Sequence, residues 1–305
     1  MSGAAAGSGT GVSGRWVVLG GSGFVGGAVV GAARAAGAVV DVVPAPRLLA
    51  PPGSTTRELL LLAEDPAVAL APALRGAVVV VLAAGLAEPG AAASDRLTGA
   101  NALLPGVVVL AAAQSGAGRV VHLSSAAVQG ERAVLDASDE LDPRSPYAVS
   151  KAGGERVLRA LVPLVPCRVV IARATSVQGP GRATTEQLRR LARSPLSSVA
   201  GAGTDPVPVT STAGLAGWVL ALAAADDPPT VSLQPAEGWT TGSLLRELGG
   251  REPLHLPAPL ARALVRVGYA VSAVAGGRGR APVRRVELVW FGQRQVDGDD
   301  PDSSR

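Results

Sequence analysis

The chain has 305 residues, of which 48 % are hydrophobic and 17 % charged, and its formal net charge is +4. This composition excludes a wholly disordered chain and allows the core of one large or two modest domains. One cysteine, Cys167, excludes an internal disulfide and a cysteine-rich zinc site, and the two histidines, His122 and His255, lie far apart, so we expect no metal site.

Short valine-rich runs alternate with alanine- and leucine-rich stretches of helical length between residues 15 and 174. In chain order, the pattern predicts strands at 15–19, 39–43, 77–82, 119–123 and 168–172, and helices at 26–36, 95–115 and 146–161. Pro105 and Gly106 lie inside the second of these helices, where neither residue favours helical structure. Strands that alternate with helices favour an α/β fold, a Rossmann-like doubly wound parallel sheet.

Composition also divides the chain into segments. Residues 1–14 are rich in glycine, alanine and serine, and 297–305 are acidic and polar, so we expect both ends to be disordered. Residues 15–174 are expected to form a dinucleotide-binding domain. Prolines cluster after residue 175, which indicates that 175–296 form a smaller mixed substrate-binding lobe, interleaved with the first domain.

Composition further limits the partners. Twenty-seven of the 28 basic residues are arginine, which explains the pI of about 10.1. Only eight residues are aromatic, too few for a surface on which nucleic-acid bases stack, so we expect no nucleic-acid partner. The start of the chain does not read as a signal peptide. Apolar runs such as 213–225 are shorter than the roughly 20 residues of a spanning helix. We therefore expect no membrane partner and a cytoplasmic location.

Three glycines at a spacing of three, Gly20, Gly23 and Gly26, follow the first predicted strand and open the first helix. In this context the first glycine permits a tight turn, the second lets the backbone approach a pyrophosphate, and the third lets helix and strand pack closely. Amides at the helix N-terminus then point at the phosphates. The residues that contribute them are expected to be Ser22, Phe24 and Val25.

The identity of the dinucleotide depends on the end of the second strand, where an acid would bond the ribose 2′-hydroxyl of NAD. By spacing from Gly26 that position falls at Pro44, and Asp41 lies three residues earlier, within the strand. Arg47 could meet the 2′-phosphate of NADP, or be a solvated loop residue. The cofactor is expected to be NAD or NADP, with NADP slightly favoured by Arg47 and by the missing acid.

The only lysine of the chain, Lys151, lies four residues after Tyr147, one of two tyrosines. This spacing puts both side chains on one face of the helix predicted at 146–161. An ammonium near a phenol favours the phenolate, so the tyrosine could exchange a proton with a substrate hydroxyl or carbonyl while hydride moves. Upstream, Ser125 ends a predicted strand, where it could donate a hydrogen bond to the reacting oxygen.

Taken together, these motifs resemble those of the extended short-chain dehydrogenase/reductase superfamily and, within it, the NAD-dependent epimerase/dehydratase family. The resemblance runs from about Arg15 to Gly181 and is weaker to about residue 290. Its elements are the glycine turn, Leu82-Ala83-Ala84, Asn101, Ser125, the pair Tyr147 and Lys151, and the segment from Ile171 to Gly181.

The resemblance implies roles for these residues. Tyr147 would be the acid/base, Lys151 would bind the nicotinamide ribose and tune the tyrosine, and Ser125 would polarise the substrate oxygen. It also implies a small-molecule substrate, a nucleotide-linked sugar in many relatives, and a possible homodimer through the helices near 95–115 and 147–161. The residues that would border the cofactor, besides the glycine turn, are Leu82, Ala83, Ala84, Asn101 and Ala174.

Several positions depart from the family's pattern. Gln129 and Gln178 stand where relatives have a tyrosine, and Thr204 stands where relatives have an arginine that meets a diphosphate. Ala126 and Ala127 replace the Asp-Glu pair of the 4,6-dehydratases, so water elimination is disfavoured.

Three functions stay open. The leading one is an NAD(P)-dependent oxidoreductase or epimerase that moves a hydride at a carbon of a nucleotide-linked sugar. The alternatives are an NADPH-dependent ketoreductase acting on a sugar or polyketide-like ketone, and a cofactor-binding scaffold without turnover.

Overall fold

The structure, a computed structural model, describes residues 13–87, 92–276 and 279–296. It divides into two compact units. The first combines the chain up to residue 131 with 138–174 and 213–234, and the second contains 132–137, 175–212 and the chain from 235 onward. The expected domain boundary at residue 174 stays a prediction. Residues 213–234 belong to the first unit, where they add a helix and an edge strand to the sheet, and 132–137 belong to the second.

A six-stranded, all-parallel sheet forms the centre of the first unit, in the order β10-β6-β4-β3-β1-β2. This confirms the predicted doubly wound sheet. The chain passes from β1 to β2 on one side and then to β3 on the other, so the strand order reverses between β1 and β3. The strands are β1 (Arg15–Leu19), β2 (Val39–Val43), β3 (Val79–Leu82), β4 (Arg119–Ser125), β6 (Arg168–Ala174) and β10 (Val231–Leu233).

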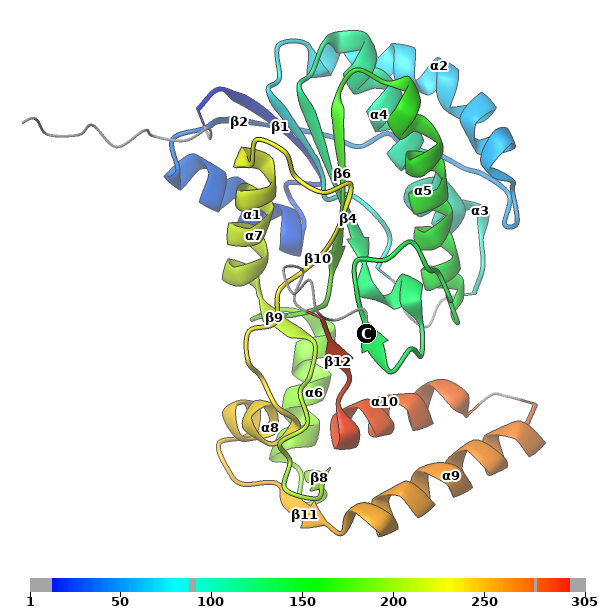
Figure 1. The fold of residues 1–305 in the computed structure, drawn as a ribbon, viewed down its shortest axis with the longest axis vertical. Coiled ribbons are helices and arrows are strands. Elements are labelled where there is room, and N and C mark those ends of the chain that lie inside the picture. Colours follow the sequence, from blue (N-terminus) through cyan, green and yellow to red (C-terminus); the bar gives the residue numbers. More distant parts are fainter. Residues whose placement is uncertain (1–12, 88–91, 277–278, 297–305) are drawn as a thin grey trace, which may run out of the picture. The chain divides into compact units, whose positions relative to one another are not determined.

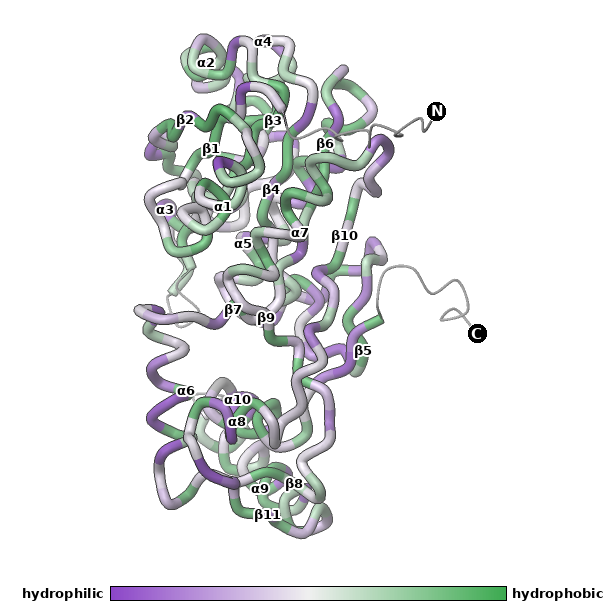
Figure 2. The backbone as a smooth tube through the Cα atoms, turned by 90° about the vertical axis from the view of Figure 1, so that its left-hand side faces the viewer, coloured by the Kyte–Doolittle hydropathy of each residue, from purple (hydrophilic) through white to green (hydrophobic). Residues whose placement is uncertain are grey.

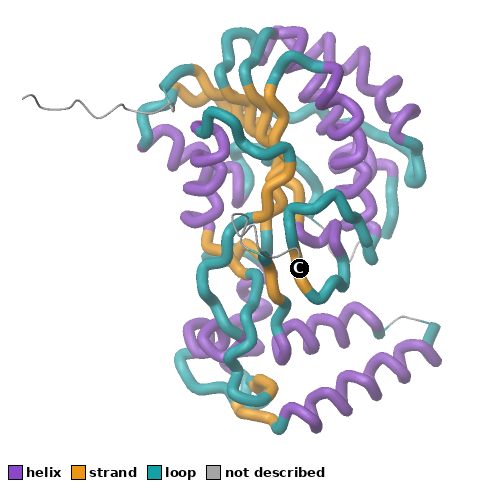
Figure 3. Tube along the Cα trace, in the orientation of Figure 1, coloured by secondary structure: helices purple, strands orange, loops and turns teal. Residues whose placement is uncertain are grey.

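Helices cover both faces of this sheet (Figure 1, Figure 3). Helices α1 (Phe24–Ala35) and α7 (Thr212–Ala224) lie on one face, and α2 (Thr56–Leu74), α4 (Leu104–Ser115) and α5 (Pro146–Leu161) lie on the other. Alternate strand residues point to the two faces, so Val17 and Val18 enter different cores. Because both faces are covered, the central strands are largely apolar, and β3 is apolar throughout, as its green colour in Figure 2 shows.

Helix α2 was not predicted from the sequence, because Pro66 and Pro72 lie inside it. A capping box starts it: the Thr55 amide donates to Glu58 Oε2 (2.7 Å), and the Glu58 amide donates to Thr55 Oγ1 (3.3 Å). Its apolar face then packs on α4. Most of α4 is consequently buried within the chain, and pairing of the helix at 95–115 with a second copy stays a prediction.

The helix predicted at 95–115 is present in three parts: α3 (Asp95–Thr98), the π-helical η1 (Gly99–Leu103) and α4. The irregularity predicted at Pro105 and Gly106 takes the form of this π segment, which ends two residues before Pro105. Among the described residues it is the one helix long and apolar enough to cross a bilayer, but 78 % of its most apolar window is buried inside the protein. It serves as a core helix of the first unit.

The second unit is built from short strand pairs and four helices. The pairs join β5 (Val134–Leu135) with β12 (Arg294–Gln295), β7 (Ser176–Gln178) with β9 (Val209–Ser211), and β8 (Ser198–Ala200) with β11 (Leu254–Leu256). The helices are α6 (Ala183–Arg193), α8 (Thr241–Gly249), α9 (Ala258–Val274) and α10 (Arg280–Phe291).

The two ends predicted to be disordered fall largely outside the described residues, which exclude 1–12 and 297–305. Gly14, at the edge of the predicted N-terminal segment, is described and accepts a hydrogen bond from the Val39 amide (3.0 Å). Disorder at the two ends stays a prediction.

Candidate active site

The glycine turn after β1 has no room for other residues at two of its three positions. Gly20 has a φ of +85°, and a Cβ there would lie 2.5 Å from the Ala84 nitrogen. A Cβ on Gly26 would lie 2.1 Å from the Gly20 carbonyl oxygen. Gly20 therefore lets the turn touch the segment after β3, and Gly26 lets α1 pack against the turn.

The open side of this turn fits the phosphates of a dinucleotide. Gly23 is exposed and is the N-cap of α1, so no capping side chain occupies the amides at the helix start. Ser22 and Phe24 are also exposed, and Val25 is half-buried. An uncovered helix N-terminus attracts an anion through its amides and its dipole.

The other predicted cofactor-binding residues end neighbouring strands of the same sheet. Leu82 ends β3 and is followed by Ala83 and Ala84, while Ser125 ends β4 and pairs in register with Ala174, the last residue of β6. The carboxyl ends of parallel strands share one edge, and ligands bind there where the strand order reverses. The contact of Gly20 with Ala84 lies at that reversal.

Lys151 connects this edge with α5. Its side chain is buried, and Nζ donates to the Leu123 carbonyl of β4 at 2.9 Å. A Cβ on Gly85, the residue after Ala84, would lie 3.2 Å from Nζ, so the ammonium lies beside the segment that touches the glycine turn. An ammonium has three donors, and Leu123 is the acceptor that the described residues provide. The remaining donors suit ribose hydroxyls.

Tyr147 lies in the first turn of α5, one turn before Lys151, and is half-buried. Ser145 caps this helix by accepting a hydrogen bond from the Ala148 amide (3.2 Å), which fixes the start of the helix. Ser125 lies two residues after Leu123, the partner of Lys151, and its Oγ accepts a hydrogen bond from the Ala127 amide (3.2 Å). The structure thus brings Lys151 next to β4 and places Tyr147 on the same helix.

Asn101, in the π-helical η1, is fully buried, and both the oxygen and the nitrogen of its side-chain amide form hydrogen bonds with protein groups. Its Oδ1 accepts from the Leu86 amide, and its Nδ2 donates to the Leu86 carbonyl and to Ser150 Oγ, each at 3.0 Å. Ser150 in turn donates to the Tyr147 carbonyl (2.8 Å). Asn101 therefore holds the loop after β3 against α5, which positions Gly85 and Lys151 relative to each other.

Burial lowers the pKa of Lys151 from 10.5 to about 8, and Glu155 opposes part of that shift. Burial also holds the pKa of His122 well below its usual range, with a further contribution from the Lys151 charge. The His122 ring, on β4, is almost wholly buried, and among the described residues neither of its nitrogens has a hydrogen-bond partner. His122 is thus neutral at neutral pH, whereas the pKa of Lys151 lies close to the neutral range.

The stability of Lys151→Met relative to wild type is expected to fall as pH rises. The folded pKa of Lys151, about 8, lies below the ordinary 10.5, so the unfolded chain binds more protons between these values and wild-type stability increases with pH there. Methionine does not titrate. The difference in unfolding free energy should therefore change by roughly 1 kcal/mol per pH unit across this window. Denaturant titrations of both cofactor-free proteins across this window test it, and a difference independent of pH would contradict it.

A buried ion pair beneath Lys151 was not predicted. Glu155, one turn after Lys151, accepts hydrogen bonds from Ser124 Oγ (2.6 Å), from Arg173 Nη2 (2.8 Å) and from Arg159 Nη2 (3.1 Å). The side chains of Glu155 and Arg173 are fully buried. The four-residue spacing from Tyr147 to Lys151 continues to Glu155 and Arg159, and this signal could have indicated that these residues share the face of α5 that meets the sheet.

The loop after β2 holds the residues that bear on the choice of cofactor. Asp41, within β2, forms an ion pair with Arg15 (2.8 Å), so its carboxylate already has a partner on the protein itself. Arg47 is exposed, and none of the described residues pairs with it. Its role toward a 2′-phosphate stays a prediction.

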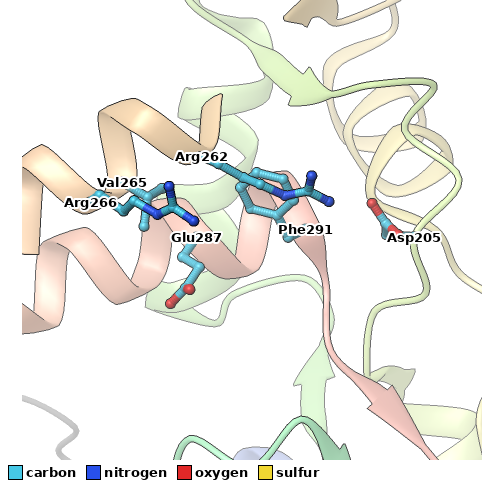
Figure 4. A pocket seen from close by; sticks show the side chains of 6 residues that line it. All are labelled: Asp205, Arg262, Val265, Arg266, Glu287 and Phe291. Carbon is cyan, nitrogen blue, oxygen red and sulfur yellow. The ribbon is translucent and has the colours of Figure 1, made fainter. Parts of the chain in front are cut away.

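A separate cavity of about 440 Å³ lies in the second unit and contains none of the predicted site residues. Figure 4 shows its lining, with the Arg262 guanidinium over the Phe291 ring at 5.7 Å from the ring centroid. The lining residues are Asp205, Arg262, Val265, Arg266, Glu287 and Phe291.

Comparisons with known proteins agree with the architecture. The model of the NAD dependent epimerase/dehydratase family matches residues 16–212, well over half of the chain. No protein of curated function matches. Among solved structures, MoeE5 in complex with UDP-glucuronic acid and NAD is 26 % identical over 80 % of this chain and 85 % of that chain, with a TM-score of 0.56.

Two further structures share the fold at lower identity. UDP-glucose 4-epimerase from Thermus thermophilus, in complex with NAD, is 23 % identical over 80 % of this chain and 86 % of its own, with a TM-score of 0.57. A double mutant of DesIV, a dTDP-glucose 4,6-dehydratase from Streptomyces venezuelae, is 24 % identical over 77 % and 79 %, with a TM-score of 0.56.

A parallel sheet with a glycine turn at its point of reversal is a dinucleotide-binding fold, and the family match identifies this chain as an enzyme of the extended short-chain dehydrogenase type. Within that class, the chain belongs to the NAD-dependent epimerase/dehydratase family.

Proposed function

We propose that this enzyme moves a hydride to and from a ring carbon of a nucleotide-linked sugar, with Tyr147 as acid/base. The observation that carries the proposal is the buried Lys151, held between the Leu123 carbonyl and Gly85, with Tyr147 one turn away on α5. The substrate class follows from the UDP-glucuronic acid bound by the structural relative MoeE5.

When bound, NAD would supply the redox chemistry, by accepting a hydride from the sugar carbon and returning it. The residues of the chain handle the proton. The Tyr147 phenolate takes the proton of the sugar hydroxyl as the carbon–oxygen double bond forms, and the phenol gives it back on reduction. The Lys151 ammonium stabilises the phenolate and binds ribose hydroxyls, and Ser125 donates a hydrogen bond to the reacting oxygen. Return of the hydride to the opposite face inverts the carbon.

The residues after β4 favour epimerisation over water elimination. Ala126 and Ala127 have no group that could remove a second proton or protonate a leaving hydroxyl. For the cofactor, the NAD bound by MoeE5 supports NAD as the working assignment. Because Arg47 is exposed, a preference for NADP stays a prediction, and a comparison of the affinities for NAD and NADP tests it.

The proposal is tested by incubating the purified protein with NAD and either UDP-glucose or UDP-glucuronic acid. The products are separated by chromatography while the absorbance of reduced nicotinamide is followed. An epimer that accumulates without net formation of NADH is the expected result. Net oxidation of NADPH with sugar or polyketide-like ketones, and no epimer, would instead establish the ketoreductase. Cofactor binding with no turnover of either substrate class would instead support the third function, a cofactor-binding scaffold.

A further inference from the structure

Helix α9 exposes a stripe of large apolar side chains. Leu260, Leu264, Val267, Val271 and Val274 follow one another at alternating spacings of four and three residues, so they share one face of the helix. Their exposed fractions run from 48 % for Leu264 to 92 % for Val274. No charged residue interrupts this face, because the two charged residues of α9, Arg262 and Arg266, project from its other side.

This apolar stripe has no partner within the described chain. The buried residues of α9, Ala261, Val265 and Ser272, lie on a different face of the helix. Gly268 on that side packs against Val283 of α10, and α10 is the one described element with which α9 has extensive contacts. Figure 1 shows the two helices side by side. One side of α9 therefore packs against α10, and the apolar stripe is exposed to solvent.

The same helical hairpin carries the positive charge of the chain. Residues 258–291 contain six arginines and one acid, Glu287, a balance of +5, whereas the whole chain has a net charge of +4. The remaining residues thus carry a net charge of −1. The Glu287 carboxylate is itself paired with Arg284 (2.7 Å). Arg266 and Arg285 are exposed, and none of the described residues pairs with them.

We propose that α9 lies on an anionic membrane surface, with the apolar stripe inserted among the lipids and the arginines of the hairpin at the level of the headgroups. An apolar face combined with a strongly basic polar face is typical of helices that bind at such an interface. This mode needs no spanning segment, and it departs from the expectation of no membrane partner, which rested on the shortness of the apolar runs. The proposal is independent of the reaction at the Tyr147 site.

A second copy of the chain fits the stripe less well. Five side chains on one helix offer a few hundred Å² per copy, below the roughly 800 Å² per partner of a stable interface. Pairing two copies through α9 would also bring two hairpins of balance +5 together. Anionic lipid headgroups complement that charge, because each arginine near the surface adds about 1 kcal/mol, or about fivefold in affinity.

The test is flotation of the full-length protein with vesicles of phosphatidylglycerol and phosphatidylcholine in equal parts, and with vesicles of phosphatidylcholine alone. Wild type should bind the anionic vesicles at least about tenfold more tightly, and added salt should weaken this binding. The double variant L264Q/V271Q should bind at least about tenfold more weakly than wild type. The charge variant R266Q/R285Q should weaken binding by about fivefold or more.

The matched control is L61Q/V68Q on α2, which replaces two exposed apolar residues at the same spacing of seven residues in the first unit. It should bind as wild type does. Thermal melts establish that each variant folds, and the charge variant keeps the proposal testable if the stripe variant does not fold. The proposal is overturned if wild type does not bind anionic vesicles, or if the control loses as much binding as the stripe variant. A wild-type dimer that L264Q/V271Q dissociates would assign the stripe to a second copy instead.

Discussion

Tyr147→Phe is expected to reduce turnover about a thousandfold while leaving NAD affinity nearly unchanged, because a positioned acid/base contributes roughly a hundred- to ten-thousandfold. The substitution removes the phenol oxygen and keeps the ring. Turnover is measured with the epimerisation assay, and NAD affinity by calorimetric titration. The substrate KM should change far less than kcat, because the hydroxyl acts in the chemical step.

The other tyrosine of the chain provides the matched control. Tyr269 lies in α9, and its hydroxyl donates to Glu287 Oε2 (2.6 Å) within the second unit. Tyr269→Phe makes the same chemical change and should leave kcat as in wild type. If Tyr147→Phe also retained wild-type turnover, the acid/base would be another group and the assignment of Tyr147 would be wrong.

The central sheet could be predicted from the sequence because local signals agree with the tertiary structure. Five of its six strands contain the predicted valine-rich runs, four of which are followed directly by glycine, proline or a polar residue, and the glycine turn identifies the first of them. Helix α2 could not be predicted in this way, since Pro66 and Pro72 contradict helix propensity locally. Its capping box and its burial against α4 outweigh that penalty, and burial depends on elements distant in the sequence.

The same distinction holds for the candidate site. The spacing of Tyr147 and Lys151 is local, so the sequence reveals it. The contact of Lys151 with Leu123, and the position of Gly85 beside it, depend on how α5 packs against the sheet. The bonds of the Asn101 amide to Leu86 and Ser150 likewise depend on tertiary structure, and its place beside the cofactor, which the resemblance implies, stays a prediction.

Arg173→Met is expected to lower the free energy of unfolding by about 3 kcal/mol or more, because removing one partner of a buried ion pair leaves an uncompensated charge. Arg173 donates to both oxygens of Glu155 and, through Nη1, to the Ser138 carbonyl (2.7 Å). Ser124 and Arg159 would still bond the Glu155 carboxylate, so the loss should fall short of that for an isolated buried charge. Urea-induced unfolding of the cofactor-free protein near neutral pH measures the effect.

The same strand contains the control for this prediction. Arg168, at the start of β6, pairs with Asp227 at the surface, where both side chains are largely exposed. Arg168→Met should change stability by no more than about 1 kcal/mol. A loss as large as that of Arg173→Met would contradict the assignment of the effect to burial.

The double variant Glu155→Gln/Arg173→Met separates charge from packing. The amide keeps an acceptor for Ser124 and removes the buried negative charge that loses its Arg173 partner in Arg173→Met. If the unpaired charge causes the loss, the double variant should recover about half of it or more. Because Glu155 joins α5 to β4 and β6 directly beneath Lys151, Arg173→Met should also weaken NAD binding, and the double variant should restore it in parallel with stability. Recovery of stability without recovery of NAD binding would show that the ion pair supports the fold but does not position Lys151.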